Sequence, residues 1–172
     1  SAEARIDMIR ALVSAVPKRP DLELLVKPHP IEAPESILDL FAATPNVTIL
    51  SRETNLKHLL EDADALVTFF SGSAFDALAS GKPVLNLAFP NSYRDRVFIE
   101  GGSTFVAENG ADVEKFLDII QGLEENAGSA LSELRTAGYN FLDSWFEFRQ
   151  GNPSARILDL IINPMNRERD VL

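Results

Sequence analysis

The chain has 172 residues, 45% of them hydrophobic and 24% charged, which suits one globular domain with a substantial core. A formal net charge of -10 argues against a nucleic acid partner, because binding a polyanion requires a clustered basic surface. Cysteine is absent, which excludes disulfides, thiolate catalysis and cysteine-based metal sites. The sequence shows neither an apolar run of membrane-spanning length nor a secretory leader, so we expect a cytoplasmic protein.

Helical and extended patterns alternate through the first third of the chain. Apolar residues at helical spacing predict a first helix that Pro17 ends, and short apolar runs predict the first strands. The predicted helices cover residues 4–16, 36–43 and 55–61, the last capped by Thr54 or Asn55, and the predicted strands cover 22–27 and 47–50. We interpret this alternation as an α/β domain with a mainly parallel sheet flanked by helices.

The middle of the chain predicts a strand, a polar turn, a helix and a second strand. Residues 65–70 form an almost unbroken apolar run, which predicts a strand buried on both faces. The Ser-Gly-Ser sequence at 71–73 ends this run, a helix follows as far as Gly81, and residues 83–87 form another apolar strand. The two strands are therefore expected to form a right-handed parallel crossover.

A small polar turn at the carboxyl end of a parallel strand is a place where α/β sheets bind anions. The backbone N–H groups and the dipole of the helix that follows both favour a phosphate. Ser71 and Ser73 would add two small hydroxyl donors. The alternative interpretation is a tight turn in which a serine caps the helix without any ligand.

A second polar tip follows the first predicted strand, where residues 27–30 read Lys-Pro-His-Pro. Pro28 and Pro30 hold the backbone around His29 in extended geometry, which directs the imidazole before any ligand arrives. An imidazole can act as a cation toward a diphosphate or as a neutral hydrogen-bond donor near neutral pH. The alternative for His29 is an ordinary loop histidine without a ligand. The other histidine, His58, lies in a short polar helix, where we expect it at the surface.

The rest of the chain predicts one strand and three helices. The strand covers 104–107, one helix runs from Gly110 or Asp112 to Gly122, and two extra C-terminal helices cover 129–150, with a break near Gly138, and 154–162. Residues 91–102 form a loop after a strand's carboxyl end, so we expect this loop on the binding side of the sheet. Residues 164–172 are expected to be a frayed tail.

An aromatic group is the unusual feature of the C-terminal part. It comprises Tyr139, Phe141, Trp145, Phe146 and Phe148. Phe141, Trp145 and Phe148 share one helical face, which predicts core packing. A docking face for a partner domain or a membrane surface is the alternative.

Two stretches together resemble a known enzyme group. Residues 63–90, ADALVTFFSGSAFDALASGKPVLNLAFP, and residues 24–30, LLVKPHP, resemble the nucleotide-binding, C-terminal half of GT-B fold transferases. The similarity is to the CDP-glycerol glycerophosphotransferase and capsule polysaccharide transferase group. UDP-N-acetylglucosamine 2-epimerases share a related Ser-Gly turn. The sequence departs from the transferase pattern at Phe69 and Phe70, where an acidic residue often follows the threonine, so no acid is assigned there.

The resemblance implies a Rossmann-like sheet with a donor site formed by these two tips. The implied donor-binding residues are Lys27, His29, Ser71, Gly72, Ser73, Asp76 and Arg94. His29 would contact the donor's phosphates and stabilise charge as the nucleotide leaves, which makes it the candidate catalytic residue. Asp76 would contact ribose or sugar hydroxyls, and its alternative role is a favourable charge near a helix N-terminus, worth about 0.3 to 1 kcal/mol.

Other basic residues could complete the lining around a donor phosphate. Arg96 is a candidate beside Arg94 in the loop at 91–102. Lys82 lies between Gly81 and Pro83, which indicates a role in the turn. Single basic residues on a surface are usually solvated.

The resemblance also implies a function and a place in a larger protein. The function would be glycosyl or glycerophospho transfer from a CDP-, CMP- or UDP-linked donor in surface polysaccharide or teichoic-acid-like synthesis. Residues 1–163 would be a single donor-nucleotide-binding domain of a longer two-domain protein, because such domains begin with a strand that the helix at 4–16 here lacks. A missing N-terminal domain would supply the acceptor site, so the isolated chain would be inactive. The full-length protein is a candidate for peripheral membrane association.

Neither a metal nor a cofactor is expected, because no group of His, Asp and Glu residues has metal-ligand spacing. Two other functions remain open. One is an isomerase related to the UDP-N-acetylglucosamine 2-epimerases, and the other is a non-catalytic nucleotide-sugar sensor or scaffold.

Overall fold

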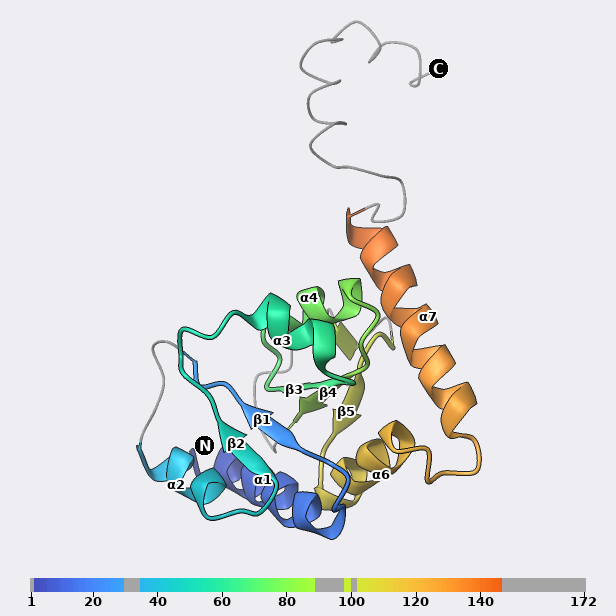
Figure 1. Cartoon of the computed structure of the whole chain (residues 1–172). Helices are drawn as coiled ribbons and strands as arrows, with labels where there is room; N and C mark the ends of the chain where they lie inside the picture. The colour runs from blue at the N-terminus through green and yellow to red at the C-terminus, as the bar shows by residue number, and fades with distance from the viewer. Residues whose placement is uncertain (1, 30–34, 89–97, 100–101, 147–172) are drawn as a thin grey trace, which may run out of the picture.

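Helices alternate with short strands along the chain, as the computed structural model in Figure 1 shows. The structure describes residues 2–29, 35–88, 98–99 and 102–146. The helices are α1 (Ala2–Ala15), the 3-10 helix η1 (Val16–Lys18), α2 (Glu35–Ala42), α3 (Leu56–Asp62), α4 (Ser73–Ala79), α6 (Gly110–Ile120) and α7 (Ala127–Phe146). The strands are β1 (Leu24–Val26), β2 (Val47–Ile49), β3 (Leu66–Thr68), β4 (Val84–Leu87) and β5 (Phe105–Ala107).

The strands form two parallel sheets in the described part of the chain. One sheet has the order β1-β2, with Leu25 opposite Thr48 in register. The other has the order β3-β4-β5, with Val67 opposite Leu85 and Asn86 opposite Val106. Every pairing is parallel, so the prediction of an α/β, Rossmann-like fold with helices around a parallel sheet is confirmed.

Two hydrophobic clusters lie on opposite faces of the β3-β4-β5 sheet. The first cluster joins α1, α2 and α6 to the strands, and β4 contributes Leu85 and Leu87 to it. The second joins α3, α4 and α7, and β4 contributes Val84. Side chains alternate between the faces along β4 because successive residues of a strand point to opposite sides. Helices therefore cover both faces of this sheet.

A buried arginine fixes the end of α1 against α6. Arg19 is only 7% exposed, and its Nε donates to Oδ1 of Asp118 over 3.0 Å. Its other guanidinium nitrogens donate to the backbone oxygens of Ala15 and Glu114. A buried guanidinium with this many partners is well satisfied, and it holds the two helices at a defined position.

The ends of the helices follow the predicted signals. Asn55 caps α3, its side chain accepting from the N–H of Lys57, so of the two predicted caps Asn55 is the one used. Asn109 caps α6 in the same way. Gly81 and Gly122 have φ values of 69° and 71°, a left-handed conformation that suits glycine at the end of a helix.

The prediction that residues 65–70 form a strand buried on both faces is wrong in two respects. The ladder covers only Leu66–Thr68, and these residues are half-buried. The strand with all four residues buried is β4. The difference arises because, among the described strands, β4 lies between two neighbours, whereas β3 pairs with one.

The predicted break at Gly138 is also wrong, because α7 runs without interruption from Ala127 to Phe146. A Cβ added at Gly138 would lie 2.8 Å from Cδ2 of Leu78, so glycine here permits close packing of α7 on α4. The predicted helix at 154–162, the tail at 164–172 and the last residues of the helix predicted at 129–150 lie outside the described residues. None of the helices in the described part of the chain has the length and apolar character needed to span a bilayer.

Candidate functional site

The predicted site residues follow the carboxyl ends of two strands. Lys27 and His29 follow β1, and Ser71 and Gly72 follow β3. Lys27 is half-buried, whereas His29, Ser71 and Gly72 are exposed and accessible to a ligand. This position matches the edge at which open α/β sheets bind their ligands.

The backbone of the serine turn has an unusual conformation. Phe70, which links β3 to the turn, has a φ of 52°. A bulky residue in this left-handed region is strained, and such strain persists only where the surrounding structure imposes it. Strained backbone is concentrated at functional sites, which makes this turn the leading candidate in the described chain.

A buried asparagine imposes that conformation. Asn86 lies on β4 with no exposed surface, and its Oδ1 accepts from the backbone N–H of Phe70 over 3.0 Å. Its Nδ2 donates to Oγ1 of Thr104 over 2.9 Å, and that hydroxyl donates to the backbone oxygen of Phe98. The turn is thus attached through a chain of buried hydrogen bonds to the interior of the sheet, where low polarity strengthens each bond.

The turn itself presents backbone and small side chains to solvent. Gly72 occupies the N-cap position of α4 without a side-chain cap, so the N-cap residue is not a serine, and the structure does not test the predicted alternative of a turn without a ligand. Ser71 instead accepts from the N–H of Ser73 over 3.3 Å through its Oγ. A Cβ added at Gly72 would meet nothing within 4 Å, so open space lies directly beside the turn.

The two neighbouring residues on α4 face different environments. Asp76 lies in the first turn of the helix and is exposed. Phe75 packs against Phe98, Phe141 and Phe146, with ring centroids 4.9, 5.8 and 5.5 Å away. Phe75 therefore supplies the packing at this point, and the carboxylate of Asp76 is left at the surface.

The basic candidates divide into three groups. Lys27 lies beside the candidate site, directly after β1. Lys82 donates to the backbone oxygen of Glu61 at the end of α3, which supports its predicted role in the turn. Arg94 and Arg96 lie outside the described residues, so their assignment remains a prediction.

Arg5 is a candidate that the sequence reasoning missed. It lies near the start of α1, and its guanidinium carbon is 4.9 Å from the centroid of the Phe69 ring, directly before the strained turn. Burial lowers the pKa of Arg5 below its ordinary value through desolvation, but an arginine still stays charged at neutral pH. A signal was present, because Arg5 lies one helical turn before the core residue Ile9, on the apolar face of α1.

The two tips lie on strands of different sheets. In the described residues β1 pairs with β2 and β3 pairs with β4, and no ladder joins β1 to β3. The hydrogen-bonded register therefore does not fix the position of His29 relative to Ser71. Their convergence on one phosphate remains a prediction.

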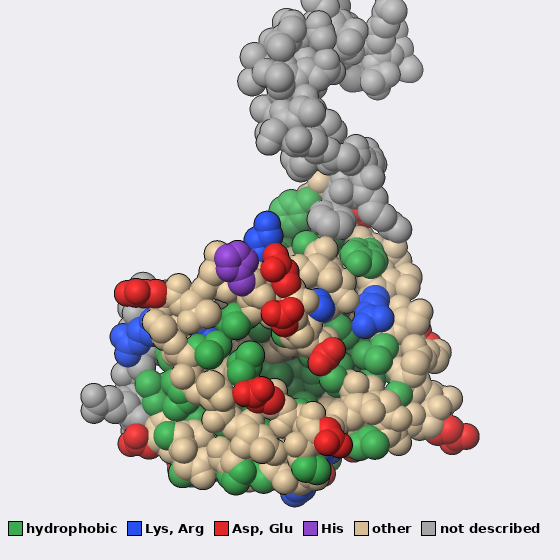
Figure 2. Space-filling model, in the orientation of Figure 1, with side chains coloured by type: hydrophobic (Ala, Val, Ile, Leu, Met, Phe, Trp, Pro, Cys, Tyr) green, Lys and Arg blue, Asp and Glu red, His purple; other side chains and the backbone are tan. Residues whose placement is uncertain are grey.

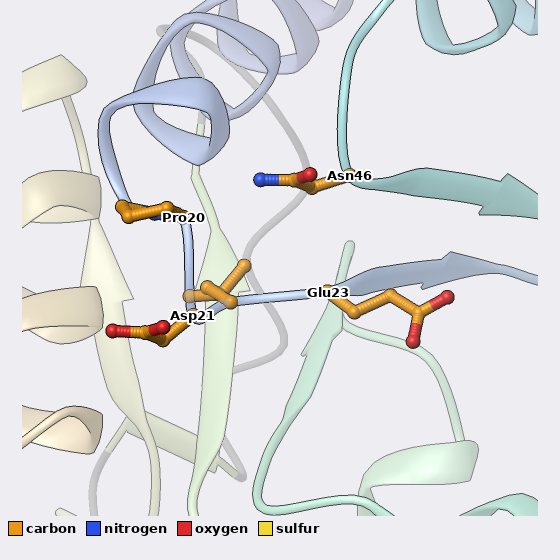
Figure 3. A pocket seen from close by; sticks show the side chains of 5 residues that line it. Pro20, Asp21, Glu23 and Asn46 are labelled. Atoms are coloured by element: carbon orange, nitrogen blue, oxygen red, sulfur yellow. The ribbon is translucent and has the colours of Figure 1, made fainter.

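A cavity of about 280 Å³ lies at the opposite edge, before β1 and β2 (Figure 3). It is lined by Pro20, Asp21, Leu22, Glu23 and Asn46. Figure 3 shows the carboxylates of Asp21 and Glu23 pointing apart, and Glu23 accepts from the hydroxyl of Thr48. Two carboxylates repel a phosphate, so we do not assign donor binding to this cavity.

The aromatic group on α7 is divided between the core and the surface. Phe141 is 5% exposed and packs in the cluster with Phe75 and Phe98, which confirms the predicted core role for this residue. Trp145 and Phe146 are 58% and 48% exposed. Phe148 lies outside the described residues.

A comparison with known protein families agrees with this arrangement of elements. The family model described as CDP-Glycerol:Poly(glycerophosphate) glycerophosphotransferase matches residues 3–163, nearly the whole chain. Neither the curated proteins nor the solved structures yield a match. The matched region contains both polar tips, the strained turn and all the described strands. The chain therefore belongs to the CDP-glycerol:poly(glycerophosphate) glycerophosphotransferase family.

Proposed function

We propose that this chain binds the nucleotide-linked donor of a glycerophosphate transfer reaction, with CDP-glycerol as the donor. The observation that carries the proposal is the turn after β3, where Phe70 is held at a φ of 52° by buried Asn86 and open space lies beside Gly72. A fixed turn with small side chains and open space beside it suits a diphosphate, because it does not have to reorganise when the ligand binds. Family membership supports the choice of donor.

The reaction is a displacement at phosphorus. A hydroxyl of the growing polymer attacks the phosphorus that carries the glycerol, and the bond from that phosphorus to the bridging oxygen breaks. Cytidine monophosphate leaves with the electron pair, and the hydroxyl proton passes to a base. Negative charge builds up on the bridging oxygen, so groups that stabilise charge at this point accelerate the reaction.

Each residue of the site has a role in this scheme. His29, Ser71, Gly72 and Ser73 hold the diphosphate, with His29 stabilising the charge on the departing nucleotide. Asp76 accepts hydrogen bonds from ribose or glycerol hydroxyls, for which a carboxylate is suited. Lys27 and Arg94 add positive charge, and we include Arg5 with them because of its position beside Phe69.

The acceptor site and the base belong to a part of the full-length protein that precedes this chain. The proposed site residues include one imidazole and one carboxylate, both assigned to the donor. A separate acceptor domain, held at the membrane surface from which the polymer grows, would complete the enzyme. The 172-residue chain should consequently bind donor weakly and transfer nothing.

Calorimetry with matched variants tests the proposal. We expect CDP-glycerol to bind the wild-type chain, and Ser71→Ala and His29→Ala each to weaken binding by roughly 10- to 100-fold, the equivalent of one hydrogen bond to a charged group. Ser80→Ala and His58→Ala serve as controls. Ser80 lies at the other end of α4 and His58 is an exposed histidine on α3, so neither change should alter affinity.

Other outcomes would identify a different function. A preference for UDP-N-acetylglucosamine over CDP-glycerol would indicate an epimerase-like isomerase. No binding of any nucleotide-linked donor, in either the chain or the full-length protein, would indicate a scaffold. Full transfer activity in the isolated chain would contradict the proposal of a separate acceptor domain.

A further inference from the structure

An aromatic ring holds Arg5 at the carboxyl edge of the β3-β4-β5 sheet. The guanidinium carbon of Arg5 lies 4.9 Å from the centroid of the Phe69 ring, which is the geometry of a cation–π contact. Phe69 directly follows the last residue of β3 and precedes Ser71 by two residues. The contact therefore places a permanently charged side chain of α1 next to the tip that carries the proposed donor site.

Two consecutive phenylalanines attach this tip to opposite faces of the sheet. Phe69 packs against the first hydrophobic cluster, on the face that α1, α2 and α6 cover. Phe70 packs against the second cluster, on the face that α3, α4 and α7 cover. Arg5 consequently lies on one side of the tip, whereas the serine turn leads into α4 on the other side. A ligand that contacts both must extend across the tip.

The contact with Phe69 does not neutralise the charge of Arg5. An aromatic face attracts a guanidinium through its quadrupole but, unlike a carboxylate, carries no net charge. Burial lowers the pKa of Arg5 through desolvation, so part of its hydration is lost before any ligand arrives. A guanidinium is also weakly hydrated by nature, and its planar fork of N–H donors matches two oxygens of one phosphate. Arg5 is therefore suited to bind a phosphate that reaches its side of the tip.

The surrounding surface favours a local cation at this point. The chain has a formal net charge of -10, and acidic side chains are spread over the face that Figure 2 shows. Asp76, exposed in the first turn of α4, adds a carboxylate close to the serine turn. Like charges repel, so each further phosphate of a ligand raises the electrostatic cost of binding here. A cation offsets this repulsion best where burial reduces the screening by solvent and salt.

We propose that Arg5 binds the second phosphate of the donor, so that the site selects nucleoside diphosphates over nucleoside monophosphates. The serine turn holds one phosphate, and the guanidinium of Arg5 holds the other across the tip. Phe69 is a positioning residue, because its ring fixes the guanidinium without contacting the ligand. This inference rests on the proposed donor site and adds the residue that makes it accept diphosphate-linked donors and reject CMP-linked ones.

Calorimetry with CDP and CMP separates the contributions of the two phosphates. Arg5→Gln should weaken CDP binding by roughly 10- to 100-fold, the equivalent of one hydrogen bond between charged groups, and CMP binding by less than about 3-fold. Retained CMP binding also shows that the variant is folded. Arg10→Gln is the matched control, because it removes the same charge from α1 at an exposed arginine that pairs with Asp7. It should leave both affinities unchanged, and an equal loss of CDP affinity in the two variants would overturn the proposal.

Phe69→Leu tests the positioning role. It keeps an apolar side chain against the first cluster and removes the aromatic face under Arg5. CDP binding should weaken by roughly 3- to 10-fold, as expected for loss of a cation–π contact. The same substitution in the Arg5→Gln variant should have no further effect, because the two residues act as one unit. Additive losses would contradict the positioning role of Phe69.

Failure of this inference can be distinguished from failure of the proposed function. If Ser71→Ala and His29→Ala weaken CDP-glycerol binding while Arg5→Gln leaves the ratio of CDP to CMP affinity unchanged, the donor site stands and the role of Arg5 is wrong. If the wild-type chain binds neither CDP-glycerol, CDP nor CMP, both are wrong.

Discussion

The two sheets of this molecule differ in how completely helices cover them. In the β3-β4-β5 sheet, helices pack on both faces and all four residues of β4 are buried. In the β1-β2 sheet, α1 and α2 cover one face, while Leu25 and Thr48 on the other face are exposed. The buried sheet contains the hydrogen bonds that hold the serine turn, so the comparison shows which half provides a rigid support for the site.

The largest expected difference between the sheets comes from removing one leucine side chain in each. Leu85→Ala in β4 should lower the free energy of unfolding by about 2–5 kcal/mol, because a fully buried side chain leaves a cavity. Leu25→Ala in β1 should lower it by less than about 1 kcal/mol, because that side chain is partly solvated. Urea denaturation of the 172-residue chain measures both. Equal losses would show that the exposed face of β1 is covered in solution.

The next largest expected effect comes from removing the Asn86 side chain, which holds the serine turn. Asn86→Ala leaves the N–H of Phe70 without its acceptor and should lower the free energy of unfolding by about 1–3 kcal/mol. It should also weaken CDP-glycerol binding, because the strained conformation of Phe70 relaxes. Asn55→Ala is the control, since loss of this helix cap lowers stability by about 1 kcal/mol without removing a hydrogen bond to Phe70. If both variants bind donor like the wild type, Asn86 has a structural role alone.

The smallest expected difference in the free energy of unfolding is between two variants that each remove one threonine hydroxyl. Thr104→Val removes a buried hydroxyl that accepts from Asn86 and donates to the Phe98 oxygen, and should lower the free energy of unfolding by about 1 kcal/mol. Thr48→Val removes an exposed hydroxyl bonded to Glu23 and should change it by no more than about 0.5 kcal/mol. Thermal denaturation of the two variants measures both losses of stability. A larger loss for Thr48→Val than for Thr104→Val would contradict the greater rigidity of the β3-β4-β5 sheet.

Local signals in the sequence predicted most of the elements but misjudged several details. Asn55, Gly81 and Gly122 mark helix ends correctly because caps and left-handed glycines act within a few residues. The prediction of a helix break at Gly138 is wrong, because glycine is needed there to let Leu78 of another helix approach closely. The burial of residues 65–70 was overestimated, since an apolar run does not reveal whether a strand has one neighbour or two.

The candidate site was predictable where it depends on neighbouring residues and not where it depends on contacts between distant segments. Ser71 and Gly72 follow an apolar strand, a pattern visible along the chain, and the structure finds them exposed beside a strained residue. Asn86 lies 15 residues after Ser71, and its hydrogen bond to Phe70 could not be predicted from the sequence, because it forms only when β3 and β4 pair. Arg5 contacts Phe69, next to this turn, only because α1 packs against the strands.

By itself, the sequence determined the alternation of helices and strands, the polar tips after β1 and β3 and the resemblance to the family, because each depends on neighbouring residues. Only the tertiary structure decided that β4 is the central strand of its sheet, that Asn86 holds Phe70 and that Arg5 lies against Phe69. These features arise from contacts between segments far apart in the chain, and a local pattern carries no information about which distant residue it will meet.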